Sequence, residues 1–276
     1  MNQSKFYIHI GLHKTGTTFL QENIFPKLKN IQYINHENFI KSLSTFDNHQ
    51  ANYFMSFEGL SGKLWDRDHN TLSFNKEHRF IESFEKTVNN LKTFFPEAVI
   101  IVFFRKHGEF LISIYKQYIK RGGTLSLNEF YKEKGIMQPE DLNYNYRIKL
   151  LKKLFNEVHV FDYNDFKKDS VATINHMCGI MNCDWNQSVN KKTSNVGLKG
   201  WKIDFTIFYN KVFKKLPIFI KRVLTKLKLE PQSLLQNTLS FLRAKDYDKF
   251  KKTSQGINNS FERDWSFVLQ HKEIIY

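Results

Sequence analysis

The chain of 276 residues carries 42 Lys and Arg against 27 Asp and Glu, a formal net charge of +15, and 41% of its residues are hydrophobic. This length can bury a full core, and the two cysteines, Cys178 and Cys183, exclude a disulfide-rich secreted protein and favour a reducing compartment. Because no apolar run is long enough for a membrane-spanning helix and no signal peptide precedes the first expected strand, we expect a cytoplasmic protein.

Strand-like and helix-like patterns alternate along the first two thirds of the chain. Short apolar or alternating runs predict strands at 6–11, 31–34, 53–57, 98–104 and 158–163. Apolar residues at helical spacing predict helices that begin at 17 and 76, one that ends at Gly122 and Gly123, and two more at 144–156 and 167–181. The run at 98–104, AVIIVFF, is apolar throughout, which is typical of a strand covered on both faces of a parallel sheet.

This alternation indicates an α/β protein, a three-layer α/β/α fold with a central parallel sheet. We expect a single domain over 1–276, with an α/β core at 1–185 and a basic, mostly helical part at 186–276 in which no strand follows Cys183. His176 lies near the two cysteines in sequence, but a structural zinc site needs four ligands. We therefore expect these side chains to pack in the core, and we expect no metal.

The stretch GLHKTGTTFLQ, 11–21, joins the first expected strand to the first expected helix. A glycine-rich turn at a helix start presents backbone N–H groups and the positive end of the helix dipole to an anion. Gly16 allows close approach to a phosphate, Thr17 and Thr18 add hydroxyl groups, and Lys14 adds a charge. The stretch therefore predicts a phosphate-binding loop.

The order of residues in this loop differs from that of a nucleotide triphosphatase. In the pattern G-x-x-x-x-G-K-[ST] the lysine follows the second glycine, and an acidic residue at the end of another strand helps to hold magnesium. Here Lys14 precedes Gly16, and the long buried strand ends at Arg105.

The loop resembles that of the sulfotransferase family, whose donor is 3′-phosphoadenosine 5′-phosphosulfate (PAPS). In that family the sequence P-K-[ST]-G-T-T holds the 5′-phosphosulfate, and here His13 stands in the proline position. The resemblance implies a P-loop-like sulfotransferase core that needs no metal, with Lys14 stabilising the leaving phosphate where charge develops. The donor-binding residues that it implies in the loop are His13, Lys14, Thr15, Gly16, Thr17 and Thr18.

A second cationic site would be needed for the 3′-phosphate of the donor. Arg105 follows the long buried strand, and Ser113 comes eight residues later on the next expected helix. An arginine fork binds two phosphate oxygens, and a serine hydroxyl donates another hydrogen bond. The stretch LKTFFPEAVIIVFFRKHGEFLISIYKQY is similar to the sulfotransferase 3′-phosphate site, which implies this role for both residues.

Transfer of a sulfuryl group to a hydroxyl or amine also requires a general base for the acceptor proton. Glu58 follows the expected strand at 53–57, so it should emerge at the carboxyl edge of the sheet beside the loop. His36 and His13 are the alternatives, because histidine has a convenient pKa whereas that of a glutamate would have to be raised by burial.

The last third is the least informative part of the sequence. Lys191, Lys192 and Ser194 lie where sulfotransferases have a looser donor-binding segment, although a polar loop before a helix would have the same composition. Segment 199–230 has nine Lys or Arg against two acids, interleaved with aromatic and aliphatic residues. Charge runs of this kind usually form a solvated basic face on a packed helix, and we expect that here; contact with the inner face of a membrane or with an acidic partner is the alternative.

These observations favour a PAPS-dependent sulfotransferase. The resemblance to bacterial and glycan sulfotransferases implies that the acceptor is a carbohydrate or glycolipid precursor. Two alternatives remain at this point: a P-loop kinase or nucleotidase with a displaced lysine, and a basic nucleic-acid-binding protein. The second has no helix-turn-helix, zinc-finger or RRM pattern to support it, so we expect no specific nucleic-acid partner.

Overall fold

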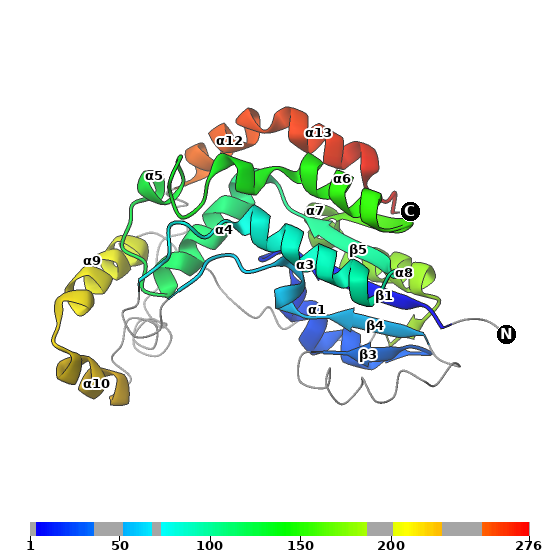
Figure 1. Cartoon of the computed structure of the whole chain (residues 1–276), viewed down its shortest axis with the longest axis horizontal. Coiled ribbons are helices and arrows are strands. Elements are labelled where there is room, and N and C mark those ends of the chain that lie inside the picture. The colour runs from blue at the N-terminus through cyan, green and yellow to red at the C-terminus, as the bar shows by residue number, and fades with distance from the viewer. Residues whose placement is uncertain (1–3, 36–51, 68–72, 187–200, 228–249, 276) are drawn as a thin grey trace.

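A five-stranded parallel sheet forms the centre of the computed structural model, which describes residues 4–35, 52–67, 73–186, 201–227 and 250–275 (Figure 1). Its strand order is β3-β4-β1-β5-β6. The strands are β1 (Phe6–Gly11), β3 (Gln32–Ile34), β4 (Tyr53–Ser56), β5 (Val99–Phe104) and β6 (Glu157–Asp162). All four strand pairs are parallel, so every carboxyl end lies at one edge, as the sequence predicts.

Helices cover both faces of this sheet, which confirms the three-layer α/β/α fold. Alternate residues of each strand point to opposite faces, so Ile100 and Val102 of β5 join one buried cluster and Ile101 and Phe103 join the other. The first cluster lies under α3 (Phe80–Phe94), α4 (His107–Lys120) and α6 (Tyr144–Leu154). The second lies under α1 (Thr17–Asn23), α7 (Tyr163–Lys168) and α8 (Ser170–Met181).

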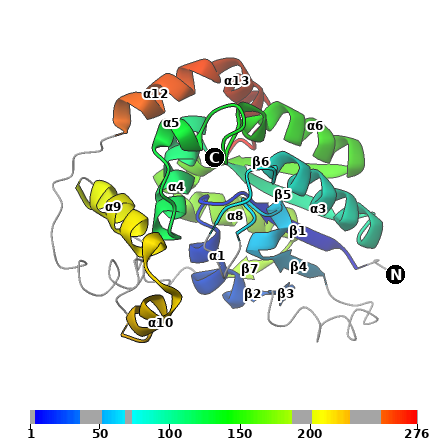
Figure 2. The ribbon, with the colours of Figure 1, turned by 60° about the vertical axis from the view of Figure 1, so that its left-hand side comes forward.

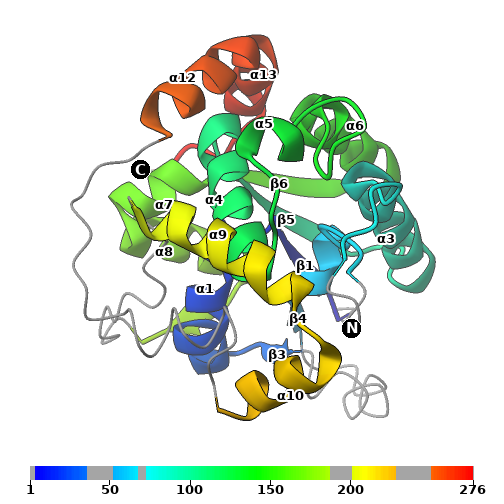
Figure 3. The ribbon, with the colours of Figure 1, turned by 90° about the vertical axis from the view of Figure 1, so that its left-hand side faces the viewer.

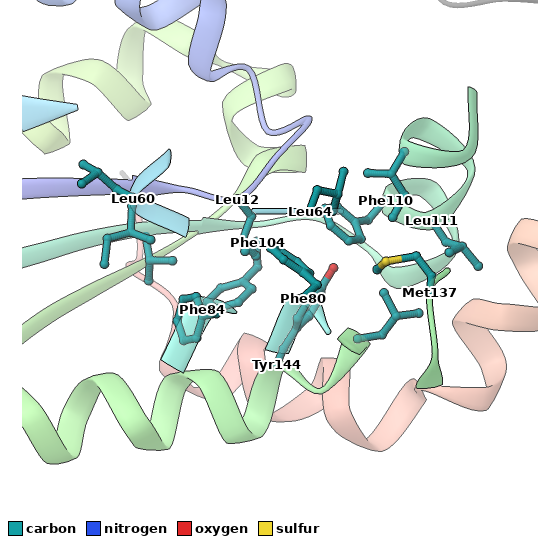
Figure 4. Packing of buried hydrophobic residues seen from close by; sticks show 14 of the residues in the cluster. Leu12, Leu60, Leu64, Phe80, Phe84, Phe104, Phe110, Leu111, Met137 and Tyr144 are labelled. Atoms are coloured by element: carbon teal, nitrogen blue, oxygen red, sulfur yellow. The ribbon is translucent and has the colours of Figure 1, made fainter. Parts of the chain in front are cut away.

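The end of β1 is fixed by the first of these clusters. Figure 4 shows Leu12, the residue after β1, among the aromatic side chains Phe80, Phe84, Phe104 and Tyr144. Leu12 is fully buried although it begins a loop. Its burial therefore anchors the start of the loop to the hydrophobic core.

Several predicted boundaries are corrected by the structure. The helix expected from 76 begins at Phe80, and the helix expected from 17 gives way after Asn23 to a 3-10 turn, η1 (Phe25–Lys27). The helix expected at 167–181 is two helices, because the side chain of Asp169 accepts a hydrogen bond from the Ala172 N–H and so begins α8.

The expectation that no strand follows Cys183 is wrong. β7 (Asp184–Trp185) pairs in antiparallel orientation with β2 (Leu28–Lys29), outside the central sheet. Two residues give no readable alternation, which is why the pattern did not predict this pair. Two further short elements, α5 (Leu127–Phe130) and η3 (Pro139–Leu142), connect α4 to α6.

The C-terminal part contains α9 (Trp201–Lys215), α10 (Ile218–Lys226), α12 (Lys251–Ser260) and α13 (Glu262–His271). Figures 2 and 3 show α12 and α13 over the sheet layers and α9 crossing α4. α12 packs on α4 so closely that a Cβ on Gly108 would overlap the backbone of Ser254. Within the described ranges, every helix is too short or too polar to cross a bilayer.

Candidate functional site

Two residues of the loop after β1 have a left-handed backbone conformation, which favours glycine. Lys14 has a φ of 66° and Gly16 a φ of 81°, both in the left-handed region. The Thr15 hydroxyl donates to the Leu12 carbonyl oxygen at 2.6 Å, which closes the turn from inside. The loop therefore bends sharply between the buried end of β1 and the start of α1.

Glycine is required at both ends of this loop. A Cβ on Gly11 would overlap the Thr17 hydroxyl, and one on Gly16 would lie 3.1 Å from the rings of Tyr163 and Phe166. Gly16 also has the positive φ that other residues adopt at a cost. The two glycines thus let α1 and α7 approach the turn closely.

The first turn of α1 leaves its backbone donors available to a ligand. Gly16 is the N-cap residue and provides no side-chain cap, and no acidic residue lies in the first turn. The first N–H groups of a helix have no intrahelical acceptor, so those of Thr17, Thr18 and Phe19 point out of the helix. This donor set and the neighbouring Lys14 fit a phosphate or phosphosulfate group.

Arg105, directly after β5, contacts the loop from the neighbouring strand. Its Nη1 donates to the Lys14 carbonyl oxygen at 3.1 Å, and its guanidinium lies 5.1 Å from the centre of the Tyr163 ring. Its Nε lies 3.5 Å from a carboxylate oxygen of Glu109. The structure therefore brings together the two cationic segments that the sequence analysis identified separately.

Ser113 lies on the part of α4 that follows Arg105. It is partly buried and comes four residues after Glu109, so the two side chains share one face of the helix. Glu109 pairs with Arg105, and Ser113 follows one turn later on the same face of α4. The pattern of motifs does not identify Glu109, although its spacing of four residues from Arg105 is one that allows an ion pair.

The backbone of Arg105 is held from the C-terminal part of the chain. The Tyr144 hydroxyl donates to the Arg105 carbonyl oxygen at 2.9 Å, and the backbone N–H of Tyr144 donates to Asp264 at 2.9 Å. Asp264, on α13, also accepts from the Asn145 N–H at 2.9 Å and lies 2.8 Å from His107 Nε2. Burial alone would raise the pKa of Asp264, but these hydrogen bonds outweigh it and lower the pKa below its usual value.

A buried polar group lies under the loop. His9 Nδ1 is 2.8 Å from the Ser56 hydroxyl, which accepts from the Gln21 side chain at 3.0 Å. Burial lowers the pKa of His9 to about 3, so its ring is neutral at physiological pH. The three side chains tie β1, β4 and α1 together directly below the turn. The only signal in the sequence was a histidine in the middle of an apolar strand.

The three candidate general bases differ in whether the structure describes them and in what they contact. His36 lies outside the described residues, as do Lys191, Lys192 and Ser194. Glu58 begins η2 (Glu58–Ser61), which follows β4 and contacts β1. The backbone of Glu58 therefore lies at the expected carboxyl edge of the sheet, and its side chain is not among the described ones. His13 Nε2 lies 3.1 Å from the Gly62 carbonyl oxygen, which connects the loop to the turn that follows η2.

Neither strand beside β1 has a carboxylate as its last residue, and Glu58 follows the end of β4 by two residues. β4 ends at Ser56, and β5 ends at Phe104 before Arg105. Asp162 ends β6, one strand further away; burial raises its pKa, and its carboxylate accepts from the Asn164 N–H at the start of α7. The described side chains around the loop are therefore mainly cationic, hydroxyl-bearing or aromatic.

No family model and no curated protein matches the sequence. A sulfotransferase from Alicyclobacillus acidocaldarius is 14% identical in structural alignment, over 80% of this chain and 100% of that chain, with a TM-score of 0.48. Mouse sulfotransferase SULT7A1, complexed with PAP, is 10% identical over 99% of this chain and 87% of that chain, with a TM-score of 0.38. Each of these two proteins is a sulfotransferase.

The two cysteines lie in the core, away from the loop. Cys178 and Cys183 are buried in the cluster under α8, and a hydrogen bond from one thiol to the other raises the pKa of Cys178 and lowers that of Cys183. His176 Nε2 instead lies 3.0 Å from Glu273. Among the described residues, no three metal-ligating side chains form a group that could hold an ion.

Proposed function

We propose that the protein is a sulfotransferase that transfers the sulfuryl group of PAPS to a hydroxyl group of a carbohydrate or glycolipid acceptor. The observation that carries the proposal is the hydrogen bond from Arg105 to the Lys14 carbonyl oxygen. It supports the view that the phosphate loop and the arginine after β5 serve one ligand with two anionic ends.

The side chains around the loop support a phosphosulfate donor over Mg-ATP. A P-loop kinase uses a carboxylate at the end of a neighbouring strand to help hold magnesium. Here Ser56 and Arg105 stand at the two strand ends beside β1, and the carboxylate that follows, Glu58, is two residues beyond Ser56 and is proposed as the general base. Arg105 and Ser113 are the residues proposed to bind the 3′-phosphate, which ATP does not have.

In the proposed reaction, the acceptor oxygen attacks sulfur in line while the bond from sulfur to the bridging phosphate oxygen breaks. Lys14 and the N–H groups at the start of α1 stabilise the negative charge that develops on that leaving oxygen. The acceptor proton passes to Glu58. This assignment is supported by the position of η2, which begins at Glu58 just after β4. Positioning and electrostatics supply most of the rate enhancement.

His36 remains a second candidate for the base. His13 is less suited to this role, because its Nε2 contacts the Gly62 carbonyl oxygen and its ring lies 5.8 Å from that of Phe80. These contacts support a positioning role, in which His13 holds the turn that carries Glu58 against the loop.

The donor site is tested by calorimetric titration with 3′,5′-adenosine bisphosphate and with ATP, each with and without magnesium. We expect metal-independent binding of the bisphosphate that weakens by about 100-fold in Arg105→Ala and in Lys14→Ala, because each removes a charge-assisted contact. Arg121→Ala and Lys27→Ala, at exposed positions outside the loop, are matched controls that should bind normally.

Three results would contradict the donor proposal. A preference for Mg-ATP would favour the kinase or nucleotidase. Steeply salt-dependent binding of arbitrary oligonucleotides without bisphosphate affinity would favour a nucleic-acid-binding protein. Equal weakening by the control variants would show that net charge, not the site, governs binding.

The general base is tested separately by Glu58→Gln. This variant should bind the bisphosphate like the parent protein and should lose transfer from PAPS to its acceptor, because glutamine cannot accept the acceptor proton. Full transfer by Glu58→Gln would refute the assignment, and His36→Gln would then be the next variant to measure. Glu133→Gln, an exposed glutamate elsewhere, controls for the loss of one negative charge.

A further inference from the structure

α9 has one buried face and one exposed apolar face. Asn210, on the buried face, donates through its Nδ2 to the carbonyl oxygens of Ile119 at 2.9 Å and Gly123 at 2.7 Å, which fastens the helix to α4. Phe208, on the opposite face, is 65% exposed, and Val212 one turn later is also exposed. The packing of α9 on the core therefore leaves its outer apolar residues uncovered.

α10 repeats this arrangement immediately after α9. Phe219 is 65% exposed and Leu227 is 62% exposed, and the exposed Val223 lies midway between them. Residues four apart lie on one face of a helix, so the three form a single stripe. Lys221, on another face of α10, donates to the Lys214 carbonyl oxygen at 2.9 Å, which links the helix to the end of α9.

Basic residues accompany both apolar stripes. Segment 201–227 contains seven Lys or Arg and one Asp, so it carries a strong positive charge. Lys211 and Lys215 lie beside the α9 stripe, and Arg222 and Lys226 lie beside the α10 stripe, as helical spacing requires. All four of these basic residues are exposed.

We propose that Phe208, Val212, Phe219, Val223 and Leu227, here named the α9–α10 surface, insert into the headgroup region of an anionic lipid bilayer. Interfacial helices combine bulky apolar side chains on one face with Lys and Arg that reach anionic headgroups. The flexible stems of these basic residues allow the charge to stay at the headgroups while the apolar residues enter the acyl boundary.

The charge of this segment distinguishes a bilayer from a second copy of the chain. Two copies joined through the α9–α10 surface would bring two strongly basic segments together, which is electrostatically unfavourable. A bilayer with anionic lipids supplies both the apolar phase and the opposite charge. This inference does not depend on sulfuryl transfer, since it concerns a surface formed by other residues.

The position of the α9–α10 surface would place the candidate site near the membrane. β1 runs from the end of the molecule that carries the N-terminus toward the end where α4 and α9 lie (Figures 1 and 3). The phosphate loop, at the carboxyl end of β1, and the α9–α10 surface therefore lie toward the same end. A membrane-bound chain would hold this end of the sheet near the bilayer.

The proposal is tested by co-sedimentation of the full chain with vesicles of phosphatidylcholine alone and of an equimolar mixture with phosphatidylglycerol. We expect binding to the mixed vesicles that weakens with added salt, and little binding to neutral vesicles. The double variant Phe208→Ser/Phe219→Ser should bind the mixed vesicles at least about 10-fold more weakly, because it removes two inserted rings. The triple variant Lys215→Gln/Arg222→Gln/Lys226→Gln should lose about 100-fold.

Matched controls separate this surface from general properties of the chain. Phe94 is 75% exposed at the end of α3, so Phe94→Ser should bind vesicles normally. Lys86→Gln/Lys152→Gln/Lys153→Gln removes the same charge from exposed positions on α3 and α6 and should have a smaller effect than the triple variant. Circular dichroism and thermal unfolding confirm that each variant is folded.

Three outcomes would overturn the proposal. One is equal loss of vesicle binding in the surface variants and their controls. Another is tight binding that persists in Phe208→Ser/Phe219→Ser. The third is self-association in analytical ultracentrifugation that the same double variant abolishes, which would assign these residues to contact between two copies of the chain.

Discussion

Two pairs of helices in the C-terminal part differ in charge and in packing: segment 201–227 has seven Lys or Arg against one acid, and segment 251–271 has three against two. α12 and α13 pack on α4 and α6, and Asp264 of α13 receives three hydrogen bonds from the core side of the molecule. α9 and α10 keep large apolar side chains in solvent. Both pairs are fastened to the core by a buried polar contact, through Asp264 for α13 and Asn210 for α9, but only the strongly basic pair keeps a row of large apolar side chains in solvent.

The largest effect is expected from removing the anchor of α13. Asp264→Ala should lower the free energy of unfolding by about 3 kcal/mol, because it leaves His107 Nε2 and two backbone N–H groups without their acceptor. Since Tyr144 positions the Arg105 carbonyl, bisphosphate binding should weaken as well. Thermal and urea unfolding measure the first effect, and calorimetry at a temperature where the variant is folded measures the second.

Asp264→Glu serves as the conservative variant, which should recover part of the bisphosphate affinity through the retained carboxylate. If Asp264→Ala lowers stability but leaves bisphosphate affinity unchanged, the link from α13 through Tyr144 to Arg105 is refuted.

Acid should loosen α13 and the residues that follow it. The pKa of Asp264 and that of Glu273 both lie below their usual values. Burial raises both pKa values, but hydrogen bonds outweigh it: those from His107 and backbone groups lower the pKa of Asp264, and those from His176 and His159 lower that of Glu273. A lowered folded-state pKa gives stability that is fully present above the unfolded-state pKa, about 4, and is lost as pH falls through the folded-state value.

Hydrogen exchange of α13 measured between about pH 5 and pH 3 should therefore show falling protection. Asp264→Asn/Glu273→Gln should show lower protection at pH 5 and a flatter pH dependence. A pH dependence as steep as that of the parent chain would assign the acid sensitivity to other carboxylates.

A smaller contrast is expected between two positions on α9 itself. Asn210→Ala should cost about 2 kcal/mol, because it removes two hydrogen bonds to buried carbonyl groups of α4 and its C-terminal turn. Phe208→Ala, two residues away on the exposed face, should change stability by less than about 0.5 kcal/mol. Urea unfolding of both variants provides the measurement, and a Phe208 cost equal to that of Asn210 would show that the outer face is packed in solution.

Much of the fold follows from local patterns in the sequence. Continuous apolar runs such as 98–104 identify strands buried on both faces, and the glycine, lysine and threonine spacing at 11–18 identifies the loop. The sequence also predicts that Lys14 and Arg105 approach one edge of the sheet, because parallel strands place their carboxyl ends together.

The remaining features depend on distant partners that local patterns do not record. Asp264 contacts His107 across 157 positions, and the burial of His9 is completed by Ser56 on another strand. The sequence pattern predicts that Asp169 is a polar residue on the surface of one helix, but its side chain accepts a hydrogen bond from the Ala172 N–H and caps a new helix. Tertiary packing therefore decides which polar residues become caps, anchors or buried neutral groups.

The smallest effect concerns Glu109, and it tests the proposed donor site most finely. Two opposing consequences follow from Glu109→Gln: Arg105 loses an ion pair that orients it, and a bound 3′-phosphate loses a nearby negative charge. The hydrogen bond to the Lys14 carbonyl and the contact with the Tyr163 ring remain to orient Arg105. We therefore expect relief of repulsion to dominate and bisphosphate binding to tighten by about 3-fold, within the range for partly exposed ion pairs.

Adenosine 5′-monophosphate is the control ligand, because it lacks the 3′-phosphate and its affinity should not change in Glu109→Gln. Tighter binding of both ligands would indicate a general charge effect. Weaker binding of the bisphosphate alone would show that the ion pair is needed to hold Arg105 in place, and that the Lys14 carbonyl and Tyr163 do not suffice.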